Sequence, residues 1–141
     1  MSMEMSLVLI KPDAMQKRSA GAIISRLEGQ GFKLAALKML QLDEASATRH
    51  YDIHIGKPFF DDLIKYIIST PIVAIVFEGE NAVEEIRETV GATDSAKAEP
   101  GTIRADFGSD VQHNAVHASD SKETAEKEIG LFFAGGEIFD Y

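Results

Sequence analysis

The sequence contains no cysteine, and it has no apolar run long enough to cross a membrane. The lack of cysteine excludes disulfide bonds and thiolate metal sites. Residues 1–5 have neither the basic segment nor the apolar core of a signal peptide. We therefore expect a soluble protein that works in the cytoplasm and does not bind a membrane.

Positive charge is also scarce. The 14 Lys and Arg residues stand against 23 Asp and Glu residues, which gives a formal net charge of −9. This balance argues against a general nucleic-acid-binding surface, so a site for phosphate groups would have to be local. The length of 141 residues and the absence of a visible linker predict a single domain over residues 1–141.

Hydrophobic patterns predict alternating strands and helices. Expected strands cover residues 5–10, 32–42, 72–77 and 111–116, and expected helices cover 21–30, 43–51, 59–69, 81–90 and 121–131. Residues 32–42 are ambiguous between helix and strand, but a preceding glycine and helix favour a strand. Residues 91–110 show little periodicity and predict a long loop, a length that usually has a function.

The order of these elements resembles an α+β, ferredoxin-like βαββαβ fold: an antiparallel sheet with a helical insertion and a long loop before the last strand. We expect helices to cover one face of this sheet. The pattern alone is compatible with many functions, so function has to be argued from particular residues.

His117 is the most informative of these residues. It follows the strand predicted at residues 111–116 and precedes a helix start at Ser121, a good capping residue. A helix N-terminus favours anions such as phosphate, and a histidine beside it can act as a nucleophile. Lys11 leaves the first predicted strand in the same way, just before Pro12.

Residues 114–121 have the sequence Asn-Ala-Val-His-Ala-Ser-Asp-Ser. This segment resembles the active-site motif of nucleoside diphosphate kinases, Asn-x-x-His-Gly-Ser-Asp-Ser, with Ala118 in place of the glycine. The resemblance covers nearly the whole chain, and further matching segments lie at residues 11–13 (Lys-Pro-Asp), 57–60 (Lys-Pro-Phe-Phe), 100–104 (Pro-Gly-Thr-Ile-Arg) and 126–130 (Glu-Lys-Glu-Ile-Gly).

The resemblance implies an enzyme that transfers the γ-phosphoryl group of ATP or another nucleoside triphosphate to a nucleoside diphosphate. The reaction would be a ping-pong cycle through a phosphohistidine at His117. The glycine-rich phosphate loop of many nucleotide enzymes is absent, so side chains would hold the phosphates. Mg²⁺ would arrive on the nucleotide phosphates, and no protein metal ligands are expected.

The same resemblance implies a role for each site residue. The phosphates would contact Lys11, Arg87, Thr93 and Arg104, and the ribose would contact Lys11 and Asn114. The base would lie between Phe59 and Val111, and Tyr51 would lie near the transferred phosphate. Glu128 would orient His117, and Ser119 would support Glu128.

Three other functions are compatible with parts of the sequence. A non-catalytic, ferredoxin-like nucleotide-binding regulatory module would keep Phe59 and the basic residues but would not need a pair of His117 and Glu128. A phosphorelay protein would be helical around its histidine. A zinc site could use histidines four residues apart, but His113 and His117 lie too far apart along a strand, and His50 and His54 lack a third ligand.

Two further expectations come from the resemblance. We expect a homo-oligomer, either a dimer or a tetramer, because a sheet covered on one face leaves its other face or an edge to a partner. A positive φ at Ala118 would strain the alanine and could tilt His117. We expect a negative φ, because every other recognisable active-site residue is in place and a misplaced nucleophile would leave these residues without a purpose.

Overall fold

The computed structural model describes residues 3–141. Its centre is a four-stranded sheet in the order β2-β3-β1-β4, in which every neighbouring pair is antiparallel. The strands are β1 (Met3–Ile10), β2 (Lys33–Leu40), β3 (Ile72–Glu80) and β4 (Val116–Ala118). Two of them, β1 and β3, are the central strands, and the order matches the expected ferredoxin-like α+β fold.

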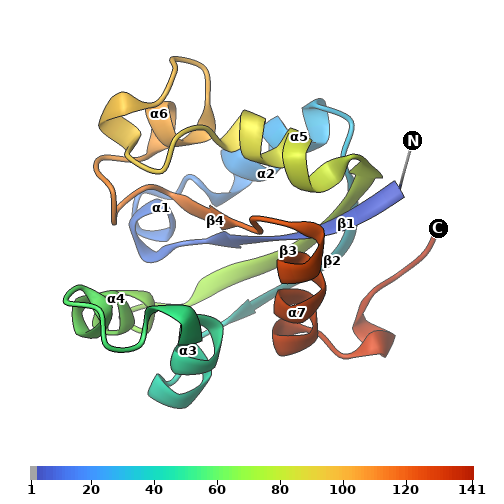
Figure 1. The fold of residues 1–141 in the computed structure, drawn as a ribbon. Coiled ribbons are helices and arrows are strands. Elements are labelled where there is room, and N and C mark those ends of the chain that lie inside the picture. Colours follow the sequence, from blue (N-terminus) through green and yellow to red (C-terminus); the bar gives the residue numbers. More distant parts are fainter. Residues whose placement is uncertain (1–2) are drawn as a thin grey trace.

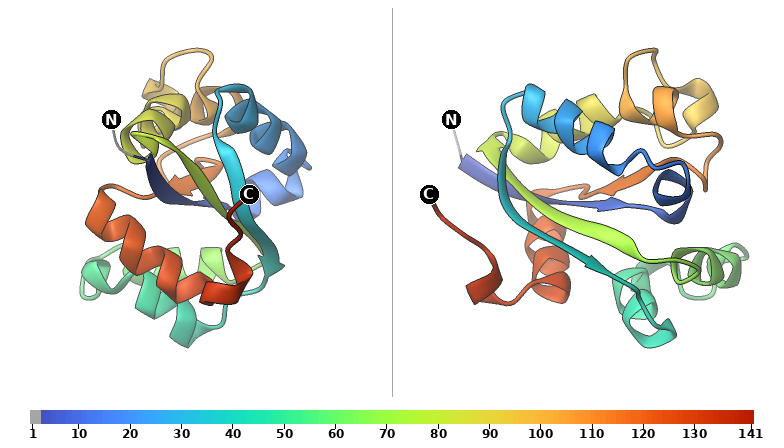
Figure 2. Two further views of the ribbon diagram at one scale, coloured as in Figure 1. Left: turned by 90° about the vertical axis from the view of Figure 1, so that its right-hand side faces the viewer. Right: turned by 180° about the vertical axis from the view of Figure 1, so that it is seen from behind.

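Helices cover both faces of the sheet (Figures 1 and 2). One face carries α1 (Pro12–Gln16), α2 (Ala20–Gly29), α5 (Ala82–Val90) and α6 (Ile103–Phe107). The other carries α3 (Glu44–His50), α4 (Phe60–Ile67) and α7 (Lys122–Phe132). Short 3₁₀ turns lie at Asp52–His54, Ser95–Lys97 and Gly135–Glu137.

The expectation of one covered face was therefore wrong. In β1, Val8 and Ile10 belong to the core on one side of the sheet, and Leu7 and Leu9 belong to the core on the other side. Side chains alternate between the two faces of a strand, so a stretch that is apolar at every position, such as residues 7–10, requires cover on both faces.

Several expected elements are confirmed. The ambiguous segment at 32–42 is a strand, β2. The side chain of Asp43 caps α3 by accepting a hydrogen bond from the Ser46 backbone N–H, and Ser121 caps α7 through Thr124 in the same way. These caps satisfy backbone donors that would otherwise lack a partner at the helix start.

The strand predicted at residues 111–116 was wrong. Asp110 accepts hydrogen bonds from the backbone N–H groups of Gln112 and His113, which folds the segment into a turn. Ala115 then takes a left-handed conformation with a φ of 72°. The strand begins only at Val116, so His117 lies within β4 and pairs with Leu9 of β1.

The loop predicted at residues 91–110 is partly helical, because it contains α6. The side chain of Thr102 caps this helix by accepting a hydrogen bond from the backbone N–H of Ala105. Helix α1, which follows Lys11, was also missed. Both helices are 5 residues long, too short for a helical period to show in the sequence.

Candidate active site

A cleft of about 550 Å³ brings the expected site residues together. It lies between the segment that holds α3 and α4 and the segment that holds α5, α6 and β4. Its walls include all the residues named from the family resemblance except Ser119: Lys11, Tyr51, Phe59, Arg87, Thr93, Arg104, Val111, Asn114, His117 and Glu128. Ser119 is fully buried behind Glu128.

Glu128 contacts the imidazole of His117 and orients it. Its Nε2 lies 2.9 Å from Glu128 Oε2, although the approach is off the axis of a linear hydrogen bond. Ser119 Oγ donates to the other oxygen of this carboxylate, Oε1, at 2.6 Å. A proton on Nε2, toward the carboxylate, leaves the lone pair on Nδ1. This geometry suits a histidine whose Nδ1 attacks an electrophile in the cleft.

Glu128 is ionised in this arrangement. Burial acts to raise its pKa, but the contact with His117 and the hydroxyl of Ser119 outweigh burial, so that the pKa lies below its ordinary value. An ionised carboxylate accepts hydrogen bonds only, which fixes the protonated nitrogen of His117 as the one that faces it.

Two buried cations, Lys11 and Arg104, line the cleft. Lys11 Nζ donates to Asn114 Oδ1 at 2.9 Å and to the Gln112 carbonyl at 2.7 Å. Burial, the largest effect, lowers the pKa of Lys11 to about 8. Arg104 donates to the carbonyls of Gly91 and Val116, and burial lowers the pKa of its guanidinium to about 10. Both cations are poorly solvated, which strengthens their attraction for an anion.

Asn114 joins the separate segments that border the cleft. Its Oδ1 accepts from Lys11, and its Nδ2 donates to the carbonyls of Thr93 at 2.9 Å and Val111 at 3.2 Å. The side chain is 3% exposed and has both ends satisfied. Asn114 therefore fixes the position of Lys11 relative to the loop that carries Thr93.

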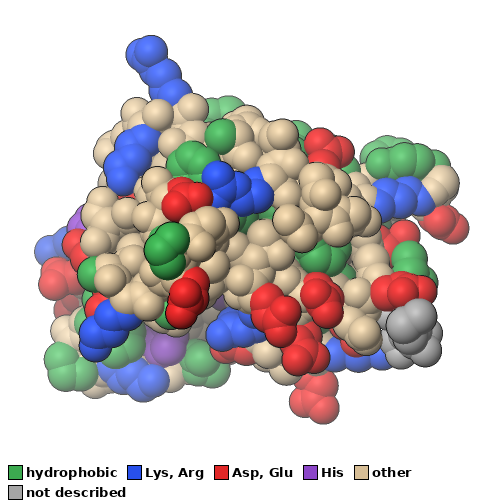
Figure 3. Space-filling model, turned by 90° about the horizontal axis from the view of Figure 1, so that it is seen from above, with side chains coloured by type: hydrophobic (Ala, Val, Ile, Leu, Met, Phe, Trp, Pro, Cys, Tyr) green, Lys and Arg blue, Asp and Glu red, His purple; other side chains and the backbone are tan. Residues whose placement is uncertain are grey.

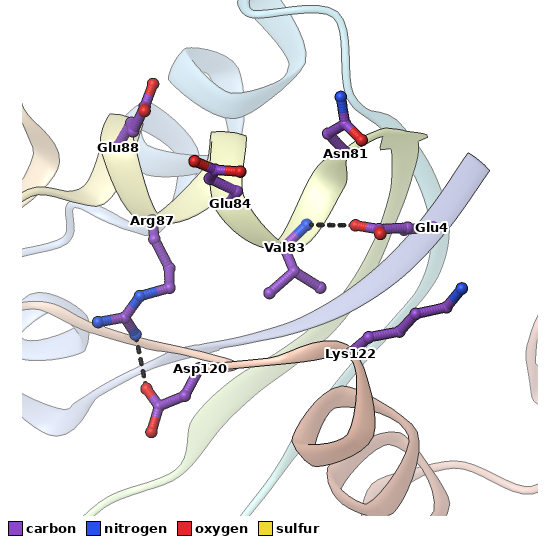
Figure 4. A pocket seen from close by; sticks show the side chains of 8 residues that line it. All are labelled: Glu4, Asn81, Val83, Glu84, Arg87, Glu88, Asp120 and Lys122. Carbon is purple, nitrogen blue, oxygen red and sulfur yellow. Dashed lines mark hydrogen bonds and ion pairs between the residues drawn. The ribbon is translucent and has the colours of Figure 1, made fainter. Parts of the chain in front are cut away.

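Arg87 is the exposed cation of the site. Its Nη1 lies 2.6 Å from Asp120 Oδ1 in an ion pair between α5 and the segment after β4 (Figure 4). The pair separates the cleft from a second, more open depression of about 580 Å³, whose lining includes Glu4, Glu84 and Glu88. Three glutamates in its lining make this depression unfavourable for a polyphosphate.

The surface charge agrees with a local phosphate site. On the face that carries α2, α5 and α6, acidic and basic side chains are interspersed and form no single basic area (Figure 3).

In the part of the chain that the structure describes, no helix has the length and apolar character needed to cross a membrane.

The mouth of the cleft is apolar and open. Phe59 is 47% exposed and Val111 is 60% exposed, although both are large apolar side chains. Tyr51 is buried deeper in the cleft wall, and burial raises the pKa of its hydroxyl, which stays protonated. Two exposed apolar groups at the entrance suit the faces of a flat ring.

Two residues of the site were missed from the sequence. His50 is buried beside His117, with 4.8 Å between the ring centres. Asp13 Oδ2 accepts from the Ala115 backbone N–H at 3.0 Å, and its Oδ1 accepts from the Tyr66 hydroxyl, which steadies the turn before β4. The matching segment Lys11-Pro12-Asp13 was a signal from which Asp13 could have been found. Nothing in the sequence linked His50 to His117.

The carboxylates that line the cleft bear on the expectation that the protein supplies no metal ligands, because each of them already has a side-chain partner. Asp52 is paired with Lys127, Asp120 with Arg87, and Glu128 with Ser119 and His117. Within residues 3–141, His50, His117 and Glu128 form the one group of three or more His, Asp or Glu residues whose ligand atoms all lie within 4.8 Å of one another. Tetrahedral zinc, with bonds of about 2.1 Å, needs atoms about 3.4 Å apart.

Comparison with known proteins places this geometry in a family. The family model described as nucleoside diphosphate kinase matches residues 4–138. A nucleoside diphosphate kinase of Roseiflexus castenholzii is 51% identical over 98% of this chain and 93% of its own length. The enzyme of that name from Dehalococcoides mccartyi is 52% identical over 99% of this chain and 98% of its own length.

Solved structures agree. The nucleoside diphosphate kinase of Aquifex aeolicus has a TM-score of 0.96 and 44% identity, covering 98% of this chain and 100% of its own. The halophilic enzyme of Halobacterium salinarum, solved in complex with CDP, has a TM-score of 0.96 and 43% identity, covering 99% of this chain and 93% of its own. With the cleft, its buried cations and the pair of His117 and Glu128, these matches show that the chain belongs to the nucleoside diphosphate kinase family.

Proposed function

We propose that the chain transfers the γ-phosphoryl group between nucleotides through a phosphohistidine at His117. The observation that carries this proposal is the orientation of the ring. Nε2 is buried against Glu128, while 20% of the His117 side chain remains exposed in a cleft that contains buried cations. A nucleotide-binding module without turnover would have no use for a histidine oriented in this way.

In the first half of the cycle, Nδ1 of His117 attacks the γ-phosphorus of the donor triphosphate. An N–P bond forms, the bond from phosphorus to the β,γ-bridging oxygen breaks, and the nucleoside diphosphate leaves. In the second half, a terminal phosphate oxygen of the acceptor diphosphate attacks the same phosphorus, and the electron pair of the N–P bond returns to Nδ1. Glu128 keeps the proton on Nε2 throughout.

The cations and polar groups of the cleft act mainly by stabilising charge, since most of the catalysis of phosphoryl transfer comes from positioning and electrostatics. Lys11, Arg87 and Arg104 would bind the phosphate oxygens, and the guanidinium groups match these oxygens well. Thr93 would add a hydroxyl to the phosphates, Asn114 and Lys11 would reach the ribose, and Tyr51 would lie near the transferred group. Phe59 and Val111 would enclose the base.

The metal of the reaction would be Mg²⁺ carried by the nucleotide. On the nucleotide phosphates, which Lys11, Arg87 and Arg104 would hold, Mg²⁺ would neutralise part of the charge. The pairing of the cleft carboxylates with Arg87, Lys127 and Ser119 supports this proposal, because it leaves the metal to the phosphates that Lys11 and the arginines hold.

We further propose that residues 1–141 act as one cytoplasmic domain and assemble into a homodimer or homotetramer. The argument from an uncovered sheet face no longer holds, but the edge of the sheet supports assembly. Strand β2 is an edge strand, and its Leu37 and Met39 are 48% and 63% exposed. An apolar edge strand is a surface that a second copy can cover.

The proposal is tested by incubating the protein with γ-labelled ATP and Mg²⁺, followed by denaturing electrophoresis at alkaline pH. We expect label on the protein that is released by acid, as a phosphohistidine requires. His117→Ala should lose both label and turnover and still bind nucleotide, because the basic and aromatic groups remain. His113→Ala is the matched control and should keep its label. Retained label on His117→Ala would contradict the proposal.

A further inference from the structure

His50 is the last residue of α3. It lies beside His117 and Glu128, but the mechanism proposed above gives it no role. Its side chain is 1% exposed. The rings of His50 and His117 pack in a T-shaped, edge-on arrangement, with an interplanar angle of 85° and 4.8 Å between the ring centres. Nδ1 of His50 lies 3.7 Å from Glu128 Oε2, the oxygen that also faces His117.

Both ring nitrogens of His50 are buried without a hydrogen-bond partner among the residues that the structure describes. Leaving a buried polar group unsatisfied costs stability, and an apolar ring of the same shape would avoid this cost. Tyr51 and Phe132 also contact the ring, so an apolar side chain would suit these surroundings. An unsatisfied histidine in this place requires a functional explanation.

The surroundings of His50 keep it neutral. Burial, the largest effect, and the nearby His117 and His54 lower the pKa of His50 to about 3, against the opposing charges of Glu128 and Asp52. A neutral imidazole carries one N–H, so it can donate to a carboxylate without adding a charge that would compete with His117.

We propose that His50 is a positioning residue, whose neutral imidazole directs Nδ1–H toward Glu128 Oε2 and holds this carboxylate in the ionised form that orients His117. The inference rests on the proposed phosphohistidine mechanism. A separation of 3.7 Å is longer than a hydrogen bond, but such contacts in unliganded enzymes often shorten when substrate binds. Glu128 would then be supported from two sides, by Ser119 and by His50.

Two substitutions separate the nitrogen atoms of His50 from its shape. His50→Phe keeps a flat ring beside His117 and removes both nitrogens. His50→Asn places an amide nitrogen near the position of Nδ1 and removes the rest of the ring. For each variant we would measure kcat and KM against pH and the melting temperature, and for the wild type we would also measure acid-labile labelling by γ-labelled ATP.

For His50→Phe we expect kcat to fall about tenfold. The apparent pKa of the acid limb in its profile of kcat against pH should rise by about one unit, because Glu128 loses a donor that favours its ionised form. Its melting temperature should stay level or rise, since the unsatisfied nitrogens are gone. For His50→Asn we expect the acid limb to return toward that of the wild type, although lost packing lowers its melting temperature.

Wild-type kcat and an unmoved acid limb in His50→Phe would overturn the inference. The same holds if His50→Asn shows the acid limb of His50→Phe, because His50 would then only fill space. Failure of the wild type to form an acid-labile phosphoprotein would instead be a failure of the proposed function, and the labelling assay separates the two results.

Discussion

At the scale of single residues, two alanines beside the proposed nucleophile differ in backbone conformation. Ala118 lies in β4 and is not among the residues with positive φ, so the expectation of a negative φ is confirmed. Ala118 is 3% exposed, and it belongs to the core under α2 and α5. The alanine that replaces the family glycine is thus a core contact and leaves the backbone of His117 unstrained.

We predict that Ala118→Gly lowers stability and leaves turnover within about tenfold of the wild type, which is 1.4 kcal/mol of barrier. Removing a buried methyl group costs about 0.8 kcal/mol, and glycine in a strand costs about 0.5–1 kcal/mol more. Thermal unfolding and steady-state kinetics test this. A much larger gain in turnover would mean that Ala118 holds His117 out of line.

Ala115→Gly is the matched control for this prediction. Ala115 is also fully buried, but its φ of 72° lies in the left-handed region, which costs a non-glycine residue about 1–2 kcal/mol. Relief of this strain offsets the lost methyl contact. The melting temperature should therefore fall less in Ala115→Gly than in Ala118→Gly, and the reverse order would refute the conformational argument.

The lowered pKa of Lys11 predicts pH-dependent nucleotide binding. Bound phosphate favours protonated Lys11, so affinity should be full below the free-state pKa of about 8 and should weaken as the pH rises above it. The limiting slope is about tenfold in Kd per pH unit. Calorimetric titration of a nucleoside diphosphate between pH 7 and pH 10 measures this dependence.

Two variants complete the Lys11 experiment. Lys11→Gln should bind weakly, and the rise in Kd that Lys11 causes above pH 8 should be absent. Lys65→Gln, which changes an exposed lysine on α4 outside the cleft, should keep the wild-type curve. A wild-type curve that is flat to pH 10 would show that Lys11 does not titrate in this range.

Residue patterns in the sequence named residues that lie together in the structure, whose roles stay predictions. The motif at residues 114–121 and the family resemblance named the residues that the structure brings to the cleft. They did not name His50 as a neighbour of His117. The two residues are 67 positions apart and meet only through packing, so no short motif contains both of them. Asp13 was part of a matching segment, but its hydrogen bond to Ala115 depends on a turn that was not predicted.

At the scale of elements, the N-terminal cap of α7 holds the helix that carries Glu128. Ser121 Oγ accepts a hydrogen bond from the Thr124 backbone N–H at 3.1 Å. We predict that Ser121→Ala lowers the free energy of unfolding by about 1 kcal/mol, the usual loss for such a cap. Urea unfolding would measure it. Ser25→Ala, at an exposed position within α2, should change stability little, and equal losses in both variants would refute the capping role.

The elements predicted correctly are those whose side chains carry the signal. Apolar runs marked β1 and β3, periodic apolar positions marked α4 and α5, and the capping residue Ser121 marked α7. The failures lie where side chains bind nearby backbone groups. Asp110 turned a segment with strand-like alternation into a turn, and Thr102 started a helix within a predicted loop. Such local hydrogen bonds compete with the hydrophobic pattern.

At the scale of the whole molecule, assembly through the β2 edge can be tested with a charge. We predict that Met39→Lys shifts the protein toward monomer, because a buried lysine at a close contact between copies is unfavourable. Sedimentation velocity measures the change. Ile55→Lys, at a similarly exposed apolar residue outside the sheet, should keep the wild-type state. A wild-type protein that is already monomeric would overturn the proposed assembly.

The central claim is that the cleft serves one phosphorylated histidine and many nucleotides. It is tested most directly by isolating the protein labelled with γ-labelled ATP and mixing it with GDP, CDP or UDP. Phe59 and Val111 offer the base only apolar faces, so label should move to all three as triphosphate, at rates within about a hundredfold. A label that no diphosphate can remove, or that only one can, would contradict the account.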